Sequence, residues 1–166
     1  MKEELKKYIK ENIEIEKPFF AKAAYSYAKN VCEEDSAINY DNNNINQFIK
    51  NNHDKTDFQA LLFNYIDERN LKDSDVYNKV HLDRRLFSKI RNDKEYHPSK
   101  ETVLLLGISL ELNEKEIIKL LESASYSLPK NNYFDLIMRF CFINKVYNIN
   151  KINDLLEEYH CKLLSV

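Results

Sequence analysis

The side chains best suited to binding chemistry are basic ones, concentrated between Lys79 and Lys100. This stretch holds seven Lys and Arg residues against three Asp and Glu residues, although the formal net charge of the whole chain is −2. Cationic side chains at this density attract phosphate groups, and they are also compatible with a solvated helix face. The candidate binding residues are Arg84, Arg85, Ser88, Lys89, Arg91, Lys94 and Lys100.

Catalytic and metal-binding patterns are absent from the sequence. It contains no glycine-rich phosphate loop, no His-Glu-x-x-His, no Cys-x-x-Cys and no Gly-x-Ser-x-Gly. His160 and Cys161 are adjacent, so their side chains would diverge on a helix. His53, His81 and His97 fall in or beside predicted turns, where polar surface roles are commoner than metal ligation. We therefore predict a protein that is not an enzyme and that holds no metal and no cofactor.

A short amphipathic helix must position the basic residues. Phe87 and Ile90 lie three residues apart and predict the buried face of this helix, while Asp83 is placed to cap its first N–H groups. Asn92 and Asp93 would end the helix, because both residue types tolerate the left-handed conformation. With the apolar pair turned inward, the outward-facing side chains are Arg84, Arg85, Ser88 and Lys89.

Similar helical patterns flank this one. Ser99 is a natural N-cap for the apolar run 104–112, and Asn113 starts another helix with Glu116 in the position of a capping box. Gly107 is the only glycine in the chain, and we interpret it as a point where two helices pack closely. The helix and turn that precede the basic helix would bury Val76, Val80 and Leu82.

Five such helical patterns follow one another between residues 57 and 126, most densely over 74–93. In their order and spacing they resemble the phage-repressor and Cro (Xre) family of helix-turn-helix modules. The resemblance implies an all-α, five-helix module whose third helix enters the major groove of double-stranded DNA. It also implies sequence-dependent DNA binding by the candidate residues, most often in a transcriptional regulator.

Three residues favour a different use of the same fold. Asp73 and Asp75 stand at the start of the second helix, where the family usually approaches a phosphate, and Leu86 is an apolar residue near the exposed face. The alternative is a protein-interaction module or inhibitor that regulates a defence or nucleic-acid-processing partner. RNA binding is a third interpretation, although the motifs of the common RNA-binding modules do not occur.

Composition predicts the class of protein and its location. One glycine, three prolines and the absence of alternating apolar runs predict an all-α chain. No window approaches the roughly 18 to 20 apolar residues that span a bilayer, and the first residues are too charged for a signal peptide. Three cysteines, an odd number, do not suggest a disulfide framework. We therefore expect a cytoplasmic protein that does not enter the membrane.

The chain divides into four predicted parts. An N-terminal helical extension covers residues 1–34, with a second helix opening at Pro18, and an Asn-rich linker with at most one short helix covers 35–56. The helix-turn-helix module occupies 57–126, and a C-terminal extension of two helices occupies 127–166.

Apolar stripes on the two extensions have two possible uses. They either pair two copies of the chain into a homodimer, as repressors of this type commonly require, or cover the core of a single copy. The stripes comprise Phe134, Ile137, Phe140 and Cys141 in the C-terminal extension, and Phe19, Phe20, Ala23 and Tyr27 in the N-terminal one.

Overall fold

The structure, a computed structural model, describes residues 1–13, 42–52 and 57–165. The chain falls into two units, Met1–Glu14 with Thr56–Val166, and Ile15–Lys55. The helix predicted to open at Pro18, its aromatic stripe and His53 lie outside the described residues. Every regular element in the described parts is a helix, so the predicted all-α class is confirmed.

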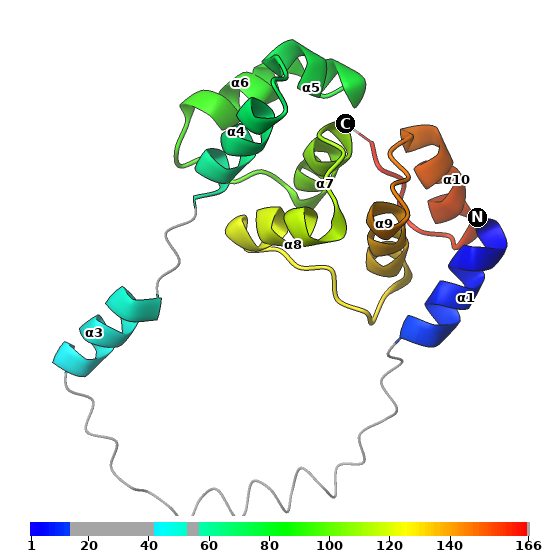
Figure 1. The fold of residues 1–166 in the computed structure, drawn as a ribbon, viewed down its shortest axis with the longest axis horizontal. Helices are drawn as coiled ribbons and strands as arrows, with labels where there is room; N and C mark the ends of the chain where they lie inside the picture. The colour runs from blue at the N-terminus through cyan, green and yellow to red at the C-terminus, as the bar shows by residue number, and fades with distance from the viewer. Residues whose placement is uncertain (14–41, 53–56, 166) are drawn as a thin grey trace, which may run out of the picture. The chain divides into compact units, whose positions relative to one another are not determined.

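Eight helices of the larger unit are described, and the smaller unit contributes α3 (Asn42–Asn52), the short helix expected in the Asn-rich segment. Figure 1 shows them in chain order by colour. The helices of the larger unit are α1 (Lys2–Asn12), α4 (Phe58–Glu68), α5 (Asp73–Lys79), α6 (Arg84–Asn92), α7 (Lys100–Ser109), α8 (Glu114–Ser123), α9 (Tyr133–Ile143) and α10 (Ile149–Glu158).

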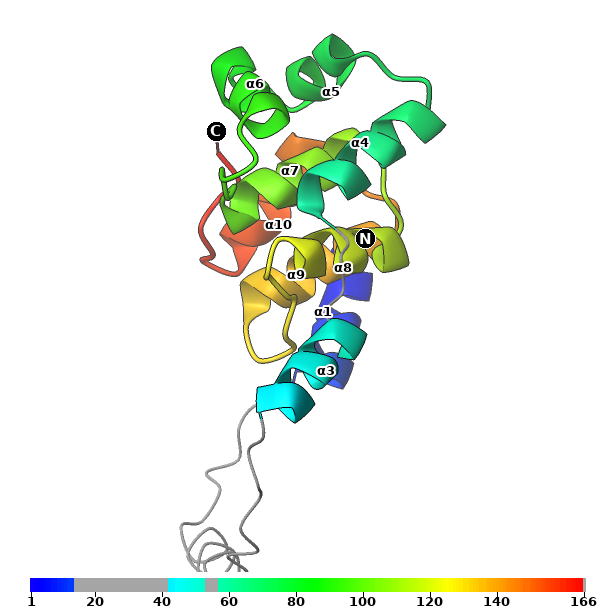
Figure 2. The same cartoon turned by 90° about the vertical axis from the view of Figure 1, so that its left-hand side faces the viewer.

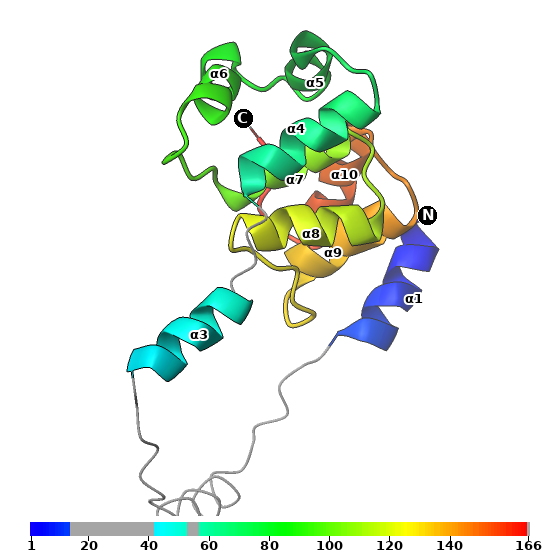
Figure 3. The ribbon, with the colours of Figure 1, turned by 60° about the vertical axis from the view of Figure 1, so that its left-hand side comes forward.

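Helix α7 is the centre of the larger unit. Every residue from Thr102 to Ser109 is buried, and the apolar run continues into Leu110 and Leu112 beyond the end of the helix. A helix without a polar face must be covered on all sides, and α5 and α8 are among the helices packed against it. Figures 2 and 3 show α5 and α6 together at one end of this unit, with α7 between them and the α8–α9 pair.

The single glycine is a close-packing point, as the sequence predicts. A Cβ atom at Gly107 would overlap the Cδ1 atom of Ile117 on α8 and would lie 3.4 Å from Cζ of Phe142 on α9. A side chain at this position would therefore require the end of the Ile117 side chain to move. The helix propensity lost at a mid-helix glycine, about 1 kcal/mol, is therefore offset by contacts with two other helices.

Side-chain caps begin the helices at positions visible in the sequence. Ser99 accepts a hydrogen bond from the Thr102 N–H at 3.2 Å, and Asn113 and Glu116 form the expected capping box. Such caps satisfy backbone N–H groups that have no partner inside the helix. Further side-chain caps are provided by Asp57, Asp83, Asn132 and Asn148.

The C-terminal extension folds as the two predicted helices, and α9 packs against α1, α8 and α10. Ile137, Phe140 and Cys141 are buried, and the ring centroid of Phe140 lies 5.5 Å from that of Tyr8 on α1. These three residues of the apolar stripe that suggested a dimer interface are thus covered within one chain, while the fourth, Phe134, is half-buried. The width of the stripe reflects contacts with α1, which the sequence places more than a hundred residues away.

Replacing Phe87 with Ala should lower the free energy of unfolding by about 3–5 kcal/mol, because the ring is 2% exposed and its loss leaves a cavity between α4, α5 and α6. Thermal or urea unfolding of the purified variant measures this. The control is Leu86→Ala, where the neighbouring side chain is only half-buried and a loss of about 1 kcal/mol is expected. Equal losses for the two variants would contradict the register of α6.

Candidate functional site

Helix α6 is fixed at the surface of the larger unit by its apolar face. Asp83 caps it as predicted, accepting from the N–H groups of Arg85 at 2.5 Å and Leu86 at 3.3 Å. Phe87 and Ile90 are buried, and the rings of Phe63 and Tyr77 pack against Phe87 with centroids 6.2 and 5.6 Å away. The side chains left in solvent are those expected: Arg84, Arg85, Ser88 and Lys89.

Two rows of polar side chains run along the exposed side of α6. Arg84, Ser88 and Arg91, spaced four and three residues apart, line a cleft of about 390 Å³. The other row is formed by Arg85 and Lys89. The residues lining the opposite side of the cleft are Lys72, Asp73, Ser74 and Tyr77, at the start of α5.

Arg91 is not a free cation in this arrangement. Its guanidinium group forms a hydrogen-bonded ion pair with the carboxylate of Asp73, and it lies 4.0 Å from the centre of the Phe63 ring. The pair joins the end of α6 to the first residue of α5. Arg91, which was predicted to bind DNA, is thus paired with Asp73. Asp73 is one of the two acidic residues whose position in the sequence disfavours DNA binding.

Lys100 also forms an ion pair, and this pair is more buried than that of Arg91. Its ammonium group donates to Asp135 at 2.6 Å, and the side chains are 26% and 4% exposed respectively. Asn132 completes the cluster, because its amide donates to the second carboxylate oxygen of Asp135 at 2.8 Å. Lys100 therefore ties the start of α7 to the start of α9, and a buried carboxylate requires such a partner.

The other basic residues among the seven candidates remain available. Lys89 is exposed and its ammonium group lies 4.5 Å from the centre of the Tyr96 ring, a cation–π contact that leaves the charge in solvent. Within the parts of the chain that the structure describes, Arg84, Arg85 and Lys94 are exposed and form no ion pair. With the exposed Ser88, five of the seven candidate residues thus form an exposed group on and just beyond α6.

Helix α6 ends at Asn92 with Asp93 as its C-cap, as predicted, but not through the left-handed conformation that Asn and Asp tolerate. Asp93 has φ −109° and ψ 104°, and neither residue has positive φ. The reason is Gln59 on α4, whose amide nitrogen donates to the carbonyls of Ile90 at 2.7 Å and Asp93 at 2.6 Å. A buried side chain thus satisfies carbonyls that a left-handed turn would otherwise satisfy.

Helix α5 is held by a comparable contact. The hydroxyl of Ser109, which is 2% exposed at the end of α7, donates to the carbonyl of Val76 at 2.6 Å. The chain then turns at His81, which takes positive φ between α5 and α6, in a predicted turn. Buried polar side chains on α4 and α7 therefore position both helices that line the cleft.

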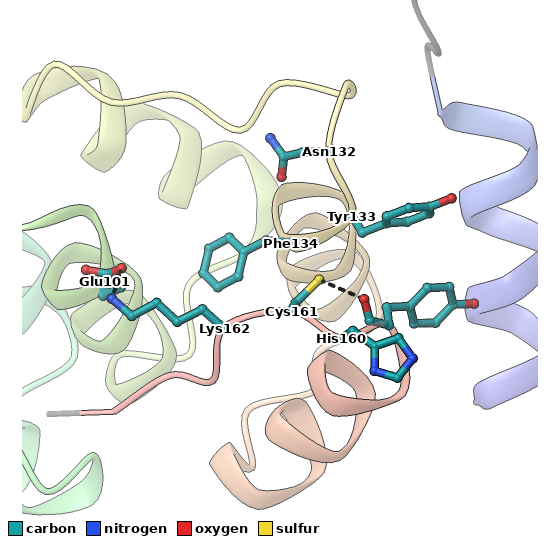
Figure 4. A pocket seen from close by; sticks show the side chains of 8 residues that line it. Glu101, Asn132, Tyr133, Phe134, His160, Cys161 and Lys162 are labelled. Atoms are coloured by element: carbon teal, nitrogen blue, oxygen red, sulfur yellow. Dashed lines mark hydrogen bonds and ion pairs between the residues drawn. The ribbon is translucent and has the colours of Figure 1, made fainter.

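A second cavity, of about 340 Å³, lies where the start of α9 meets the C-terminal segment. Figure 4 shows Phe134 and Tyr133 on one side, and the Glu101–Lys162 ion pair, at 2.9 Å, on another. The Cys161 thiol points toward the backbone carbonyl of Tyr159, which accepts from it at 3.6 Å. Burial raises the pKa of Cys161, so this thiol is protonated at neutral pH, unlike an activated nucleophile.

Two further findings concern ions and membranes. Among the described residues, no group of three His, Cys, Asp or Glu side chains converges in a way that could hold a metal ion. In the same parts of the chain, no helix has the length and apolar character needed to cross a bilayer.

Comparison with known proteins produced no significant match to a family model, to a curated protein or to a solved structure. The function must therefore be argued from the site itself.

Replacing Gln59 with Leu should lower the free energy of unfolding by about 2–3 kcal/mol, because two carbonyls lose their partner and one of them is buried. Amide hydrogen exchange should accelerate most in the last turn of α6. Asn92→Ala is the control: it removes a side-chain hydrogen bond to the Ser88 carbonyl at the exposed side of the same turn, and should cost under about 1 kcal/mol. Unchanged protection of α6 in Gln59→Leu would show that this amide does not hold the helix end.

Proposed function

We propose that the larger unit binds double-stranded DNA in a sequence-dependent way, with α5 and α6 acting as a helix-turn-helix and α6 entering the major groove. The observation that carries the proposal is the exposed group of Arg84, Arg85, Ser88 and Lys89 on a helix whose opposite face is buried, with Lys94 just beyond the end of that helix. Guanidinium and ammonium groups on such a helix bind phosphates and base edges.

The dimensions of α6 support this use. A helix of nine residues is about 13 Å long, and with its side chains it is about as wide as the major groove. The two rows would then face different parts of the groove. Arg85 and Lys89 would be the freest to reach base edges, while Lys94, just beyond the helix, would contact a phosphate. Binding energy from these contacts is useful only if α6 is held rigidly, which Gln59 and the buried Phe87 provide.

We further propose that the protein is a cytoplasmic transcriptional regulator. This role requires that it bind particular DNA sequences in preference to others. One recognition helix makes few base contacts, so high specificity would require two copies on adjacent half-sites. The stripe around Phe140 is covered within the chain, so a homodimer would need another surface. Sedimentation or light scattering at micromolar concentration would show whether the mass is 19.8 kDa or twice that value.

The acidic residues around the cleft favour a second candidate. Asp73 neutralises Arg91, while Asp75 and Asp83 start the two helices that would face the DNA. A protein partner that offers both acidic and basic side chains would suit this mixed surface better than a phosphate backbone does. The alternative is thus a protein-interaction module that keeps the helical arrangement without binding nucleic acid.

Reversing both charges in Arg84→Glu/Arg85→Glu should abolish binding to duplex DNA. Lys94→Ala should weaken binding about equally for all sequences and reduce the salt dependence by roughly one phosphate contact. Fluorescence anisotropy with random and genomic duplexes, at about 50 mM salt, measures both effects.

The matched control is Lys115→Glu/Lys119→Glu, which makes the same change of charge at two exposed positions of α8. It should alter binding far less than the α6 variant does. Equal losses from the two double variants would indicate a general charge effect rather than an interface on α6. Wild-type protein that retains no duplex at this salt concentration would reject DNA binding and favour the protein-partner alternative.

A further inference from the structure

The cleft between α5 and α6 contains one anionic side chain among groups that would otherwise suit a phosphate. Its other polar lining residues are cationic or carry hydroxyl groups. The carboxylate of Asp73 pairs with Arg91 and so occupies one of the guanidinium groups that line the cleft.

We propose that Asp73 is an internal competitor for phosphate, so that Arg91 contacts DNA only when the Asp73–Arg91 pair opens. This inference rests on the proposed function. Asp73 would thereby lower the affinity of the interface for DNA. Arg91 would bind a phosphate only after it has separated from Asp73.

Opening the Asp73–Arg91 pair should require little free energy. The two side chains are 38% and 42% exposed, and solvent weakens ion pairs with this exposure. The Phe63 ring on α4 supports the guanidinium group at 4.0 Å, independently of the carboxylate. Arg91 can therefore change its anionic partner from a carboxylate to a phosphate while it stays over the Phe63 ring.

The neighbouring carboxylate differs in its contacts. Asp75, two residues further along α5, accepts from the backbone N–H of Lys72 at 3.3 Å and from the hydroxyl of Ser74 at 3.5 Å. It has no contact with Arg91 among those that the structure records. Asp75 carries the same charge at nearly the same place. Comparing substitutions at Asp73 and Asp75 therefore distinguishes competition for Arg91 from the general repulsion between a carboxylate and a phosphate.

The test is a double-mutant cycle on the full chain, with duplex binding measured across a salt series. Asp73→Asn should increase the affinity about fivefold at about 50 mM salt, which is the most that the loss of an exposed ion pair can give, and add roughly one phosphate contact to the salt dependence, as the release of one further counterion requires. Arg91→Ala alone should change the affinity little. In the Asp73→Asn background, Arg91→Ala should remove the whole gain.

The control Asp75→Asn should give a gain of no more than about twofold, with an unchanged salt dependence. A gain from Asp73→Asn that persists in the Arg91→Ala background, or an equal gain from Asp75→Asn, would overturn the competition and leave only general repulsion. An unchanged affinity in Asp73→Asn, with a wild type that binds, would overturn it while the proposed function stands. No binding by either protein, with thermal melts showing both folded, would instead reject the proposed function.

Discussion

The burial of α7 on every side is the constraint on which the rest of the larger unit depends. A helix that offers no polar face cannot lie at a surface, so other helices must surround it. Gly107 allows α8 to approach, and α5 is drawn to the end of α7 through the Ser109 hydroxyl. Helix α6 in turn packs against α4 and α5, through the Phe63 and Tyr77 rings and the Gln59 amide, and its charged face is left in solvent.

Two charged residues illustrate how the same chemistry can serve structure or binding. Lys100 and Arg91 both belong to the basic stretch, yet each is paired with a carboxylate of another helix. Lys100 is half-buried against Asp135 and is needed to keep that carboxylate in a buried site. The Arg91 pair is more exposed and is correspondingly easier to exchange. The density of basic residues in the sequence does not distinguish a structural cation from a binding one, because it does not show which carboxylate each cation is paired with.

Local features of the fold could be predicted from the sequence, whereas its long-range contacts could not. The caps at Asp83, Ser99 and Asn113 and the buried pair Phe87 and Ile90 depend on residues three or four positions apart, which the pattern displays directly. The amide of Gln59 acts on a carbonyl 31 residues away, and the Lys100–Asp135 pair spans 35. Neither partner has a distinctive local signal. The end of α6 at Asn92 and Asp93 was therefore predicted correctly, whereas the left-handed conformation suggested for it was not found, because the distant Gln59 amide binds the carbonyls there.

The contact between α1 and α9 has a consequence for the order of folding. Leu5 and Ile9 are buried in the same unit as α9, although roughly 120 residues separate them along the chain. During synthesis at about 5–20 residues per second, α1 leaves the ribosome many seconds before α9 exists. An isolated helix of 11 residues is marginal in water, so α1 gains its stability only once α9 has been synthesised. Helix α1 is therefore made well before the partner it packs against, and its docking must follow the formation of α9.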